Sequence, residues 1–259
     1  MSKLKLNIVI VGAGNVAWHL AKELQKKEQN ILQVYNRSVE SAISLSRRLK
    51  CDFTTRIEDL NRDADLYILA VKDSAIEEVS ESLKLKNKLV VHTSGAIEQD
   101  VIKYDRRGVL YPLQTFSKEK KLNFQNIPFC IEASKSQDYN TLMRLANLLG
   151  PMVYNIDSYQ RKVLHIAAVF ACNFSNYMYM ISDEILGKES IPLDILHPLI
   201  KETASKITKH NPKDVQTGPA TRKDKSTIDT HLKYLKEGNN YDIYKILTEN
   251  IITKNNDEL

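Results

Sequence analysis

The 259-residue sequence is poor in the side chains that hold metals and disulfides. Its three cysteines, Cys51, Cys130 and Cys172, form no Cys-x-x-Cys pair, and no two of its six histidines are spaced i, i+4. These spacings exclude the common zinc motifs and a disulfide framework. We therefore expect no metal site and three cysteines that serve as buried packing residues.

The sequence also lacks a long apolar run and a strong charge bias. No stretch approaches the ~20 apolar residues that span a bilayer, and the first expected strand begins too close to Met1 to leave room for a signal peptide. The net charge is only +5, and the lysine-rich segments at 84–88 and 118–121 have no interleaved aromatic residues. These features predict a cytoplasmic protein that binds neither nucleic acid nor membranes.

The sequence does contain a strand that turns sharply into a helix, Ile8-Val9-Ile10-Val11-Gly12-Ala13-Gly14-Asn15-Val16-Ala17. Gly12 permits a tight turn, Gly14 leaves room for a pyrophosphate, and the small Ala17 lets the helix pack close to the strand. The N–H groups around Asn15 and Val16 then face the phosphates, where the helix dipole favours negative charge. An apolar strand before the turn and an amphipathic helix after it supply the context that this motif requires, so we predict a dinucleotide site.

The end of the second expected strand indicates which dinucleotide binds. In an NAD site an acidic residue lies about 20 residues after the glycines and accepts from the ribose 2′-OH. Here that place is taken by the neutral Asn36, followed by Arg37 and Ser38. A guanidinium and a hydroxyl suit a 2′-phosphate, so we predict NADP as the cofactor. Alternatively, Arg37 is only a solvated residue at the start of a helix.

The first 156 residues alternate strands and helices, as is typical of a parallel sheet covered on both faces. Strands are expected at 6–11, 31–35, 51–54, 66–71, 88–92, 108–111, 127–131 and 152–154. Helices are expected after the first strand and at 38–49, 74–83 and 136–149. Prolines beside the last two strands indicate edge positions. We therefore predict an α/β fold with a Rossmann-type, doubly wound parallel sheet, in which residues 1–156 form an NADP-binding domain.

Residues 157–259 show no strand pattern and predict an all-α domain. A helix at 159–187 is apolar on most sides, which indicates burial in a bundle or against a partner subunit. Ser226 and Asp229 have the spacing of a capping box at the start of a later helix. We interpret this region as a substrate-binding domain that also forms a homodimer. Its further helices are expected at 192–209, 227–236 and 240–253.

Loops beyond the carboxyl ends of the strands are the candidate ligand contacts in a doubly wound sheet. Val71 and Lys72 follow a central strand, and we expect them along the cofactor's ribose and phosphates. In the alternative interpretation, Asp73 or Ser74 in the same loop caps a helix.

Two further loops are expected at the same edge of the sheet. His92-Thr93-Ser94-Gly95-Ala96 suits a close approach to a nicotinamide or substrate, where His92 can exchange a proton near neutral pH and Ser94 can contact the cofactor. Alternatively, this loop is a tight turn in which Ser94 caps a helix at 97–103. In the next loop, Gln114 is expected to face the pocket.

A polar stripe interrupts the apolar helix at 159–187. At 100° per residue, Asn176 lies on nearly the same face as His165, with Cys172 on that face and Asn173 beside it. Buried polar groups cost free energy unless they are hydrogen-bonded. These side chains therefore either satisfy one another at a subunit interface or line a pocket.

The loop Thr217-Gly218-Pro219-Ala220-Thr221-Arg222-Lys223-Asp224 differs from a plain linker. Gly218 and Pro219 fix its path, and the Arg222 guanidinium can hold a carboxylate or phosphate with two hydrogen bonds. Asp224 either orients Arg222 or stays in solvent. His231, two turns into the next helix, is expected to point toward the same place.

Taken together, these motifs resemble a known superfamily. The glycine turn, Asn36-Arg37-Ser38 and the long-helix C-terminal region are similar to the phosphogluconate dehydrogenase-like proteins. The segments His92-Thr93-Ser94-Gly95-Ala96, Tyr111-Pro112-Leu113-Gln114-Thr115-Phe116 and Gly218-Pro219-Ala220-Thr221-Arg222 with Asp224 more closely resemble Rossmann-like proteins with an uncharacterised C-terminal domain. Members of that group are usually assigned as NADP oxidoreductases.

The resemblance implies a nucleotide domain, a helical domain that dimerises, and an active site in the cleft between them. Better-known relatives carry a Lys in the long helix, with an Asn four residues later, as acid and orienting group. Here His165 stands near that place, Val169 lies four residues beyond it, and Lys162 is one turn early. The identity of the general acid is therefore left open.

These inferences lead to an expected function. We predict an NADP-dependent oxidoreductase that transfers a hydride between NADP(H) and a small carbonyl or imine, whose carboxylate is held by Arg222. His165 is the expected acid or base, Asn173 or Asn176 orients the substrate, and His92 is the reserve. The alternative is a non-catalytic NADP(H) sensor that acts through a partner. A reduced deazaflavin as second hydride carrier is a third possibility.

Overall fold

The computed structural model describes residues 4–235 and 240–256. Its contacts divide the chain into two compact units, Met1–Val169 and Phe170–Leu259. The first unit holds a sheet, and the described part of the second is helical. The contact boundary lies after the domain boundary that we expected at 156/157, because the helix that follows the last strand packs with the sheet.

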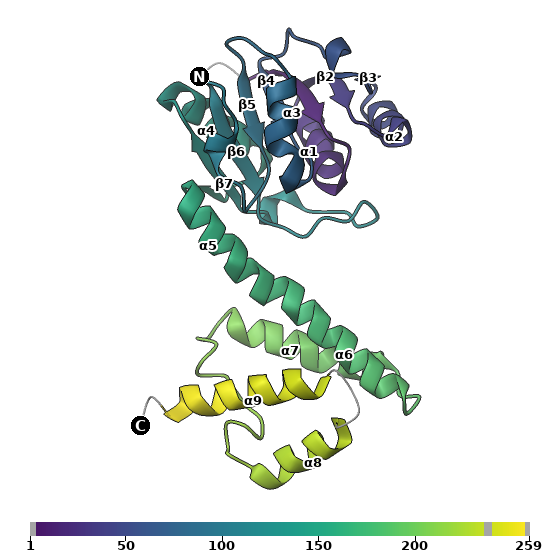
Figure 1. Cartoon of the computed structure of the whole chain (residues 1–259), viewed down its shortest axis with the longest axis vertical. Coiled ribbons are helices and arrows are strands. Elements are labelled where there is room, and N and C mark those ends of the chain that lie inside the picture. The colour runs from purple at the N-terminus through teal and green to yellow at the C-terminus, as the bar shows by residue number, and fades with distance from the viewer. Residues whose placement is uncertain (1–3, 236–239, 257–259) are drawn as a thin grey trace. The chain divides into compact units, whose positions relative to one another are not determined.

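Strands and helices alternate along the first unit (Figure 1). The strands are β1 (Asn7–Val11), β2 (Asn30–Tyr35), β3 (Asp52–Thr54), β4 (Leu66–Leu69), β5 (Leu89–His92), β6 (Arg107–Pro112), β7 (Phe129–Ala133) and β8 (Val153–Asn155). The helices are α1 (Asn15–Lys26), α2 (Val39–Leu49), α3 (Ile76–Ser82), α4 (Ser136–Leu149) and α5 (Ser158–Ala168). Only a short 3₁₀ turn, Gln99–Val101, forms in the described structure where the alternative interpretation placed a helix at 97–103.

The strand order is β3-β2-β1-β4-β5-β6-β7-β8. Neighbouring strands pair in parallel except β6 and β7, where Leu110 stands opposite Ile131 in an antiparallel register. The predicted α/β class is confirmed, with one reversal of direction. The prediction that β7 is an edge strand is wrong, because Pro128 lies just before the strand and removes no N–H from its ladder. β8 does form an edge.

Alternation along each strand sends its side chains into two separate cores. Ile8 and Ile10 of β1 pack with residues of α1, α2 and α4, whereas Val9 and Val11 pack with residues of α3. Helices therefore cover both faces of the sheet. Because β1, β2, β4, β5 and β6 run parallel, their carboxyl ends meet at one edge, and the loops there are free to hold a ligand.

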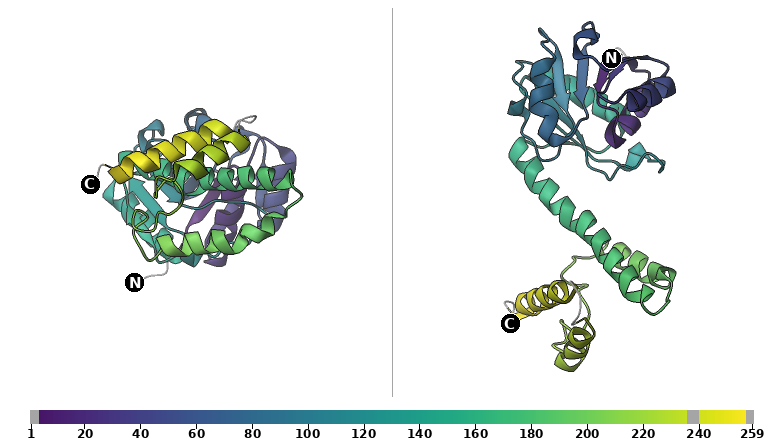
Figure 2. Two further views of the ribbon diagram at one scale, coloured as in Figure 1. Left: turned by 90° about the horizontal axis from the view of Figure 1, so that it is seen from below. Right: turned by 45° about the vertical axis from the view of Figure 1, so that its right-hand side comes forward.

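The backbone stays helical from α5 into the second unit. A π-helical segment, Val169–Phe174, joins α5 to α6 (Ser175–Gly187), so the helix expected at 159–187 is present but contains a wider turn. A short 3₁₀ turn precedes α7 (His197–Ile207), and α8 (Lys225–Leu235) packs against α9 (Asn240–Asn256) (Figure 2).

Asp224 caps the start of α8. Its carboxylate accepts from the Thr227 N–H at 3.1 Å and from the Thr227 hydroxyl at 2.7 Å. These bonds lower the pKa of Asp224. The predicted capping box of Ser226 and Asp229 is therefore wrong, since α8 begins at Lys225, before Ser226.

The long helix is much more exposed than its composition predicts. Phe170 is 65% exposed, and in the described part of the second unit the buried residues are Ala220, Ile228 and Thr248. Of the two expected surroundings, burial in a bundle within the chain is therefore wrong, and burial against a partner subunit stays a prediction. A helical unit with so little buried apolar surface has little of its own core to stabilise it.

Several expected absences can be compared with the structure. No helix in residues 4–235 and 240–256 has both the length and the apolar character to cross a membrane. The same residues contain no group of three or more potential metal ligands. Cys130 is buried and Cys51 is half-buried, but Cys172 is exposed, so its expected packing role is wrong.

Candidate functional site

The turn between β1 and α1 requires glycine at its first position. Gly12 has a φ of +113°, and a Cβ there would lie 2.3 Å from the Ala70 carbonyl oxygen. Its N–H donates to the Tyr35 carbonyl at 2.7 Å, which ties the turn to the end of β2. A Cβ on Gly14 would meet no atom within 4 Å. Gly12 therefore serves the fold, whereas Gly14 borders open space.

Helix α1 begins at this turn without a side-chain cap. Its first intrahelical bond runs from the Trp18 N–H to the Gly14 carbonyl at 2.9 Å, so the preceding N–H groups of the first turn take no part in the helical ladder. Ala17 is buried against the sheet, as its size predicts, and Val16 packs at the edge of the core. The start of α1 thus presents N–H donors to the open space beside Gly14.

A cavity of about 330 Å³ lies at this helix start. The turn residues Gly12 to Asn15 line it, as do Asn36 and Arg37 after β2 and Val71 and Lys72 after β4. Seven predicted cofactor residues therefore surround one cavity. Sequence reasoning missed six other lining residues, Tyr35, Ser41, Ala70, Ala75, Val79 and Lys118.

The charges around the cavity are all of one sign. Arg37, Lys72 and Lys118 line it, and no carboxylate does so within the described part of the chain. None of the three cations forms an ion pair among the described residues. Three cations without an ion pair and a helix N-terminus fit a ligand with several phosphates. The residues present therefore match the phosphate groups of a dinucleotide.

Ser38 forms local hydrogen bonds and is not among the residues that line the cavity. Its hydroxyl accepts from the Ser41 N–H, so Ser38 caps the start of α2. The same hydroxyl donates to the Glu40 carboxylate. Asn36 Nδ2 donates to the Ser38 carbonyl at 3.1 Å and so holds the turn before α2. Asp73 and Ser74 provide no side-chain cap for α3 in the described structure.

The loop after β5 closes into a tight turn around Ser94. The Ser94 hydroxyl accepts from the N–H groups of Ala96 and Ile97, each at 3.1 Å. The Ser94 N–H in turn donates to Nδ1 of His92 at 3.1 Å. The tight turn of the alternative interpretation is therefore present, but in the described structure it leads to a short 3₁₀ turn and not to the helix expected at 97–103.

His92 is held as a neutral side chain. It is fully buried, and its Nε2 forms no hydrogen bond of acceptable geometry in the described structure. Burial lowers the pKa of His92 to about 4, the charge of Arg161 adds to the shift, and the Glu98 backbone partly opposes it. A group that binds its proton only near pH 4 is a poor acid at neutral pH.

A second polar pair lies beside this loop. Nδ1 of His165 on α5 lies 3.2 Å from the hydroxyl of Tyr111 at the end of β6, a hydrogen bond whose direction depends on the histidine tautomer. A Cβ on Gly95 would lie 2.7 Å from both His165 Nδ1 and Tyr111 Cζ. Glycine at position 95 therefore permits the close approach of the two side chains.

Burial sets the protonation of the Tyr111 phenol. It raises the pKa of Tyr111 to about 12, with Cys130 adding to the shift and Arg161 opposing it. The phenol is therefore a hydrogen-bond donor at neutral pH. The sequence placed Tyr111 at a strand end but did not identify it as a site residue, because nothing local indicates its contact with a residue 54 positions later.

Arg161 holds α5 against the sheet. Its side chain is fully buried, which is costly for a charge unless it is paired. It donates to Glu132 Oε2 at 2.6 Å, to the Ile97 carbonyl at 2.5 Å and to the Ser158 hydroxyl at 3.1 Å. These bonds join α5 to β7 and to the loop after β5, one helical turn before His165.

The other predicted site residues lie in different surroundings. Asn173 lies in the π-helical segment, and both Asn173 and Asn176 are exposed. The wider π turn breaks the 100° step on which the shared face with His165 was predicted. Gln114 is exposed, and its amide oxygen accepts from the Thr115 N–H at 2.8 Å.

The loop before α8 is folded by its own backbone. The Arg222 N–H donates to the Gly218 carbonyl and the Asp224 N–H to the Pro219 carbonyl. The Arg222 side chain is exposed, while Asp224 caps α8 as described. His231 Nδ1 lies 2.8 Å from the Tyr244 hydroxyl, so it joins α8 to α9.

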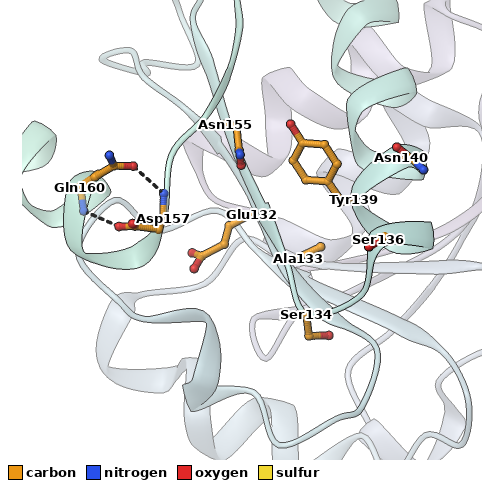
Figure 3. A pocket seen from close by; sticks show the side chains of 9 residues that line it. All are labelled: Glu132, Ala133, Ser134, Ser136, Tyr139, Asn140, Asn155, Asp157 and Gln160. Atoms are coloured by element: carbon orange, nitrogen blue, oxygen red, sulfur yellow. Dashed lines mark hydrogen bonds between the residues drawn. The ribbon is translucent and has the colours of Figure 1, made fainter.

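A second cavity, of about 370 Å³, has a different chemistry (Figure 3). It lies beyond the carboxyl ends of β7 and β8, and its lining contains Glu132 and Asp157 and no cation among the described residues. Figure 3 shows Asp157 hydrogen-bonded to Gln160 at the start of α5, where it completes a capping box. Two carboxylates disfavour a phosphate ligand here.

The state of His92 predicts a specific pH dependence of stability. The unfolded chain binds a proton at His92 with a pKa of about 6.5, whereas the folded chain does so only near 4. Between these values the unfolded state holds more protons, so the free energy of unfolding falls with falling pH, by at most about 1.4 kcal/mol per pH unit. His92→Asn should flatten this slope in urea titrations between pH 6.5 and 4. The matched control His197→Asn removes an exposed histidine, and an equal flattening in it would contradict the assignment.

Comparisons with known proteins agree with this site. Residues 7–95 match the family described as NADP oxidoreductase coenzyme F420-dependent, and residues 127–251 match a domain of unknown function, DUF2520. No curated protein matches the chain.

Three solved structures illustrate the range of similarity. A Bacteroides fragilis protein assigned as an NADP oxidoreductase is 42% identical, with 96% of this chain and 98% of that one covered and a TM-score of 0.90. A 1-pyrroline-5-carboxylate reductase from Streptococcus pyogenes is 17% identical, with 97% and 98% covered and a TM-score of 0.65. An imine reductase from Myxococcus stipitatus in complex with NADP⁺ is 13% identical, with 97% and 93% covered and a TM-score of 0.68.

The two reductases are under 25% identical and show the fold alone. The Bacteroides fragilis protein is similar enough over nearly the whole of both chains to show the family, and the two family matches divide the chain in the same way. The resemblance predicted from the sequence motifs is therefore confirmed: the chain belongs to the family of NADP oxidoreductases that combine a Rossmann-type domain with a DUF2520 domain.

Proposed function

We propose that this protein is an NADP(H)-dependent reductase of small carbonyl or imine compounds that carry a carboxylate. The observation that carries the proposal is the cavity beside Gly14, in which three cations and an uncapped helix start lack a carboxylate partner within the described residues. NADPH, when bound there, supplies the hydride. The chain's own residues bind the cofactor, orient the substrate and supply a proton.

Phosphate groups account for the residues around the cavity. The N–H groups at the start of α1 suit the pyrophosphate, and Lys72 at the end of β4 adds a positive charge. Arg37 and Ser41 suit the 2′-phosphate of NADP, since they follow β2 at the place where an NAD site has an acid. Asn36 leaves that place neutral and repels neither cofactor.

Tyr111 and His165 suit the proton transfer that must accompany hydride transfer to a carbonyl or imine. A His165 ring that carries a proton on both nitrogens can donate Nδ1–H to the Tyr111 oxygen and pass the Nε2 proton to the substrate oxygen or nitrogen, which leaves a neutral imidazole and an unchanged phenol. The buried His92, by contrast, does not hold a second proton near neutral pH. This difference favours His165 over His92 as the acid.

The substrate carboxylate remains a proposal from chemistry. Arg222 is exposed, and its guanidinium forms no ion pair in the described part of the chain. Such a group suits bidentate recognition of a carboxylate. Asn173, Asn176 and Gln114 are retained as proposed polar contacts of the substrate, since their side chains are exposed.

A second copy of the chain is the proposed partner of the C-terminal helices. Large apolar side chains stand exposed along the second unit, among them Phe170, Ile195, Leu199 and Ile246. A unit with three buried residues in its described part needs further apolar burial to be stable. A symmetric contact of this unit with its copy supplies it without a second gene product.

Arg37→Ala should separate the two pyridine nucleotides. Loss of a charge-assisted bond to the 2′-phosphate should raise the Kd for NADPH by about 10- to 100-fold and leave that for NADH within about twofold. Isothermal titration calorimetry of both nucleotides measures this difference. Arg47→Ala, in the last turn of helix α2, which begins just after Arg37, is the matched control and should change neither Kd. Equal losses of affinity for NADPH and NADH in Arg37→Ala would refute the assignment of Arg37 to the 2′-phosphate.

His165→Ala should separate binding from chemistry. Removal of the proton donor should lower kcat by about 10²- to 10⁴-fold, whereas the Kd for NADPH should stay unchanged. The measurement is the fall in NADPH absorbance with panels of 2-oxo acids and cyclic imines. His210→Ala, an exposed histidine elsewhere, serves as control. Full activity of His165→Ala on a substrate that the unaltered protein reduces would remove His165 from the mechanism.

The dimer proposal predicts the outcome of a double charge substitution. Ile195 and Leu199 are 66% and 62% exposed, so Ile195→Asp with Leu199→Asp leaves the core of the first unit untouched and should dissociate the dimer into monomers, whose helical unit is then less stable. Sedimentation velocity measures the mass. The control Val39→Asp alters a 46% exposed residue of the first unit and should leave the dimer intact. A monomeric unaltered protein at micromolar concentration would contradict the proposal.

A further inference from the structure

A segment distant in sequence is tied to the start of α1. The connection between β6 and β7 passes α1 at the edge where β1 ends (Figure 1). Asn15 Nδ2 donates to the Phe116 carbonyl at 2.9 Å, and His19 Nε2 lies 2.8 Å from the Ser117 carbonyl. The rings of His19 and Phe116 also pack, with centroids 5.8 Å apart. We call residues 116–121 the α1 strap.

The strap brings Lys118 to two neighbours. Lys118 lines the phosphate cavity together with Arg37 and Lys72. Its Nζ also lies 5.3 Å from the centroid of the Trp18 ring, where Lys22 Nζ approaches the same ring at 5.5 Å. Lys22, however, does not line the cavity. Lys118 is therefore a cation shared between an aromatic ring and an anion site.

The surroundings of Trp18 indicate the end of the cavity that Lys118 reaches. Trp18 and Lys22 lie on α1, which packs beside α2. Burial lowers the pKa of Lys22, and the charge of Arg48 on α2 adds to this shift, so Lys22 lies near that helix. Helix α2 starts just after Arg37 and contributes Ser41 to the cavity. Lys118 thus shares the cavity with Ser41 of α2 and contacts, through Trp18, the helix that packs beside α2.

We propose that Lys118 is a second cationic ligand, with Arg37, of the 2′-phosphate on the adenosine ribose, and that binding draws Lys118 away from Trp18. The proposal rests on NADP(H) as the cofactor of the proposed function. A charge-assisted hydrogen bond to a phosphate is stronger than a cation–π contact with the half-buried Trp18 ring, so the bound phosphate should hold the ammonium group in preference to the ring. The strap holds Lys118 close by in the meantime, which limits the conformational entropy lost on binding.

The preference for NADPH over NADH then depends on two chain segments. Arg37 follows β2 directly, whereas Lys118 arrives from the connection after β6. Two cations on one phosphate bind it more tightly than one and also neutralise more of its charge. The single tryptophan of the chain, Trp18, provides an optical signal for the step.

The experiment compares two lysines that share the Trp18 ring. Adenosine 2′,5′-bisphosphate and 5′-AMP, which differ only in the 2′-phosphate, are titrated while Trp18 fluorescence is recorded. The bisphosphate should change the emission of the unaltered protein and of Lys22→Ala, and 5′-AMP should not. Lys118→Ala should lose the response. Its Kd for NADPH should rise about 10-fold or more, with the Kd for NADH within about twofold and both unchanged in Lys22→Ala.

Each other outcome overturns the proposal in a recognisable way. Equal losses of affinity for NADPH and NADH in Lys118→Ala would assign the lysine to the pyrophosphate that both nucleotides share. An unchanged Kd for NADPH in Lys118→Ala would refute the role of Lys118 as a ligand. A Trp18 emission that stays constant when the bisphosphate is added to the unaltered protein would refute the displacement of Lys118 from the ring. If the unaltered protein binds neither NADPH nor NADH, the proposed function itself fails. Lys118 is half-buried and lies outside the helices and strands, so a thermal melt of Lys118→Ala should match that of the unaltered protein.

Discussion

The contact between Gly12 and the carbonyl of Ala70 is the constraint on which the nucleotide edge depends. The chain leaves β1, crosses the end of β4 at a distance that no Cβ tolerates, and enters α1 at once. A hydrogen bond from the Gly12 N–H to the Tyr35 carbonyl also holds the end of β2 against this turn. Three strand ends and one helix start are thereby held around one cavity, and Arg37 and Lys72 take their places from the strands that precede them.

A similar close approach organises the neighbouring polar pair. The missing side chain of Gly95 leaves the space in which Tyr111 and His165 meet, and Arg161 fixes the helix that carries His165. The cost of burying the guanidinium is offset by Glu132, Ser158 and a backbone carbonyl. The same charge helps to keep His92 neutral. One buried arginine therefore influences both histidines, one by position and one by charge.

The sequence predicts the fold and the phosphate cavity well because both depend on local patterns. Alternating apolar runs define the strands, and the residues just after β1, β2 and β4 must meet when those strands are parallel. Lys118, Tyr111 and Arg161 escaped prediction for the opposite reason. Their partners lie about 50 to 100 positions away or in another element, and no periodicity encodes such contacts. The surroundings of the long helix stayed open at the level of sequence, since composition does not distinguish burial within a chain from burial against another molecule.

The reversal of β7 fixes how much chain can lie between Arg161 and His165. Glu132 stands opposite Val109 on β6, and Tyr111 is two residues further along that strand, or about 7 Å. On α5, the four residues from Arg161 to His165 advance by about 6 Å, which nearly equals the distance from Val109 to Tyr111 along β6. One inserted or deleted residue would rotate the imidazole by about 100° and separate it from Tyr111. Length variation in this family is therefore admissible before Ser158 or beyond the π turn, but not within that single turn of helix.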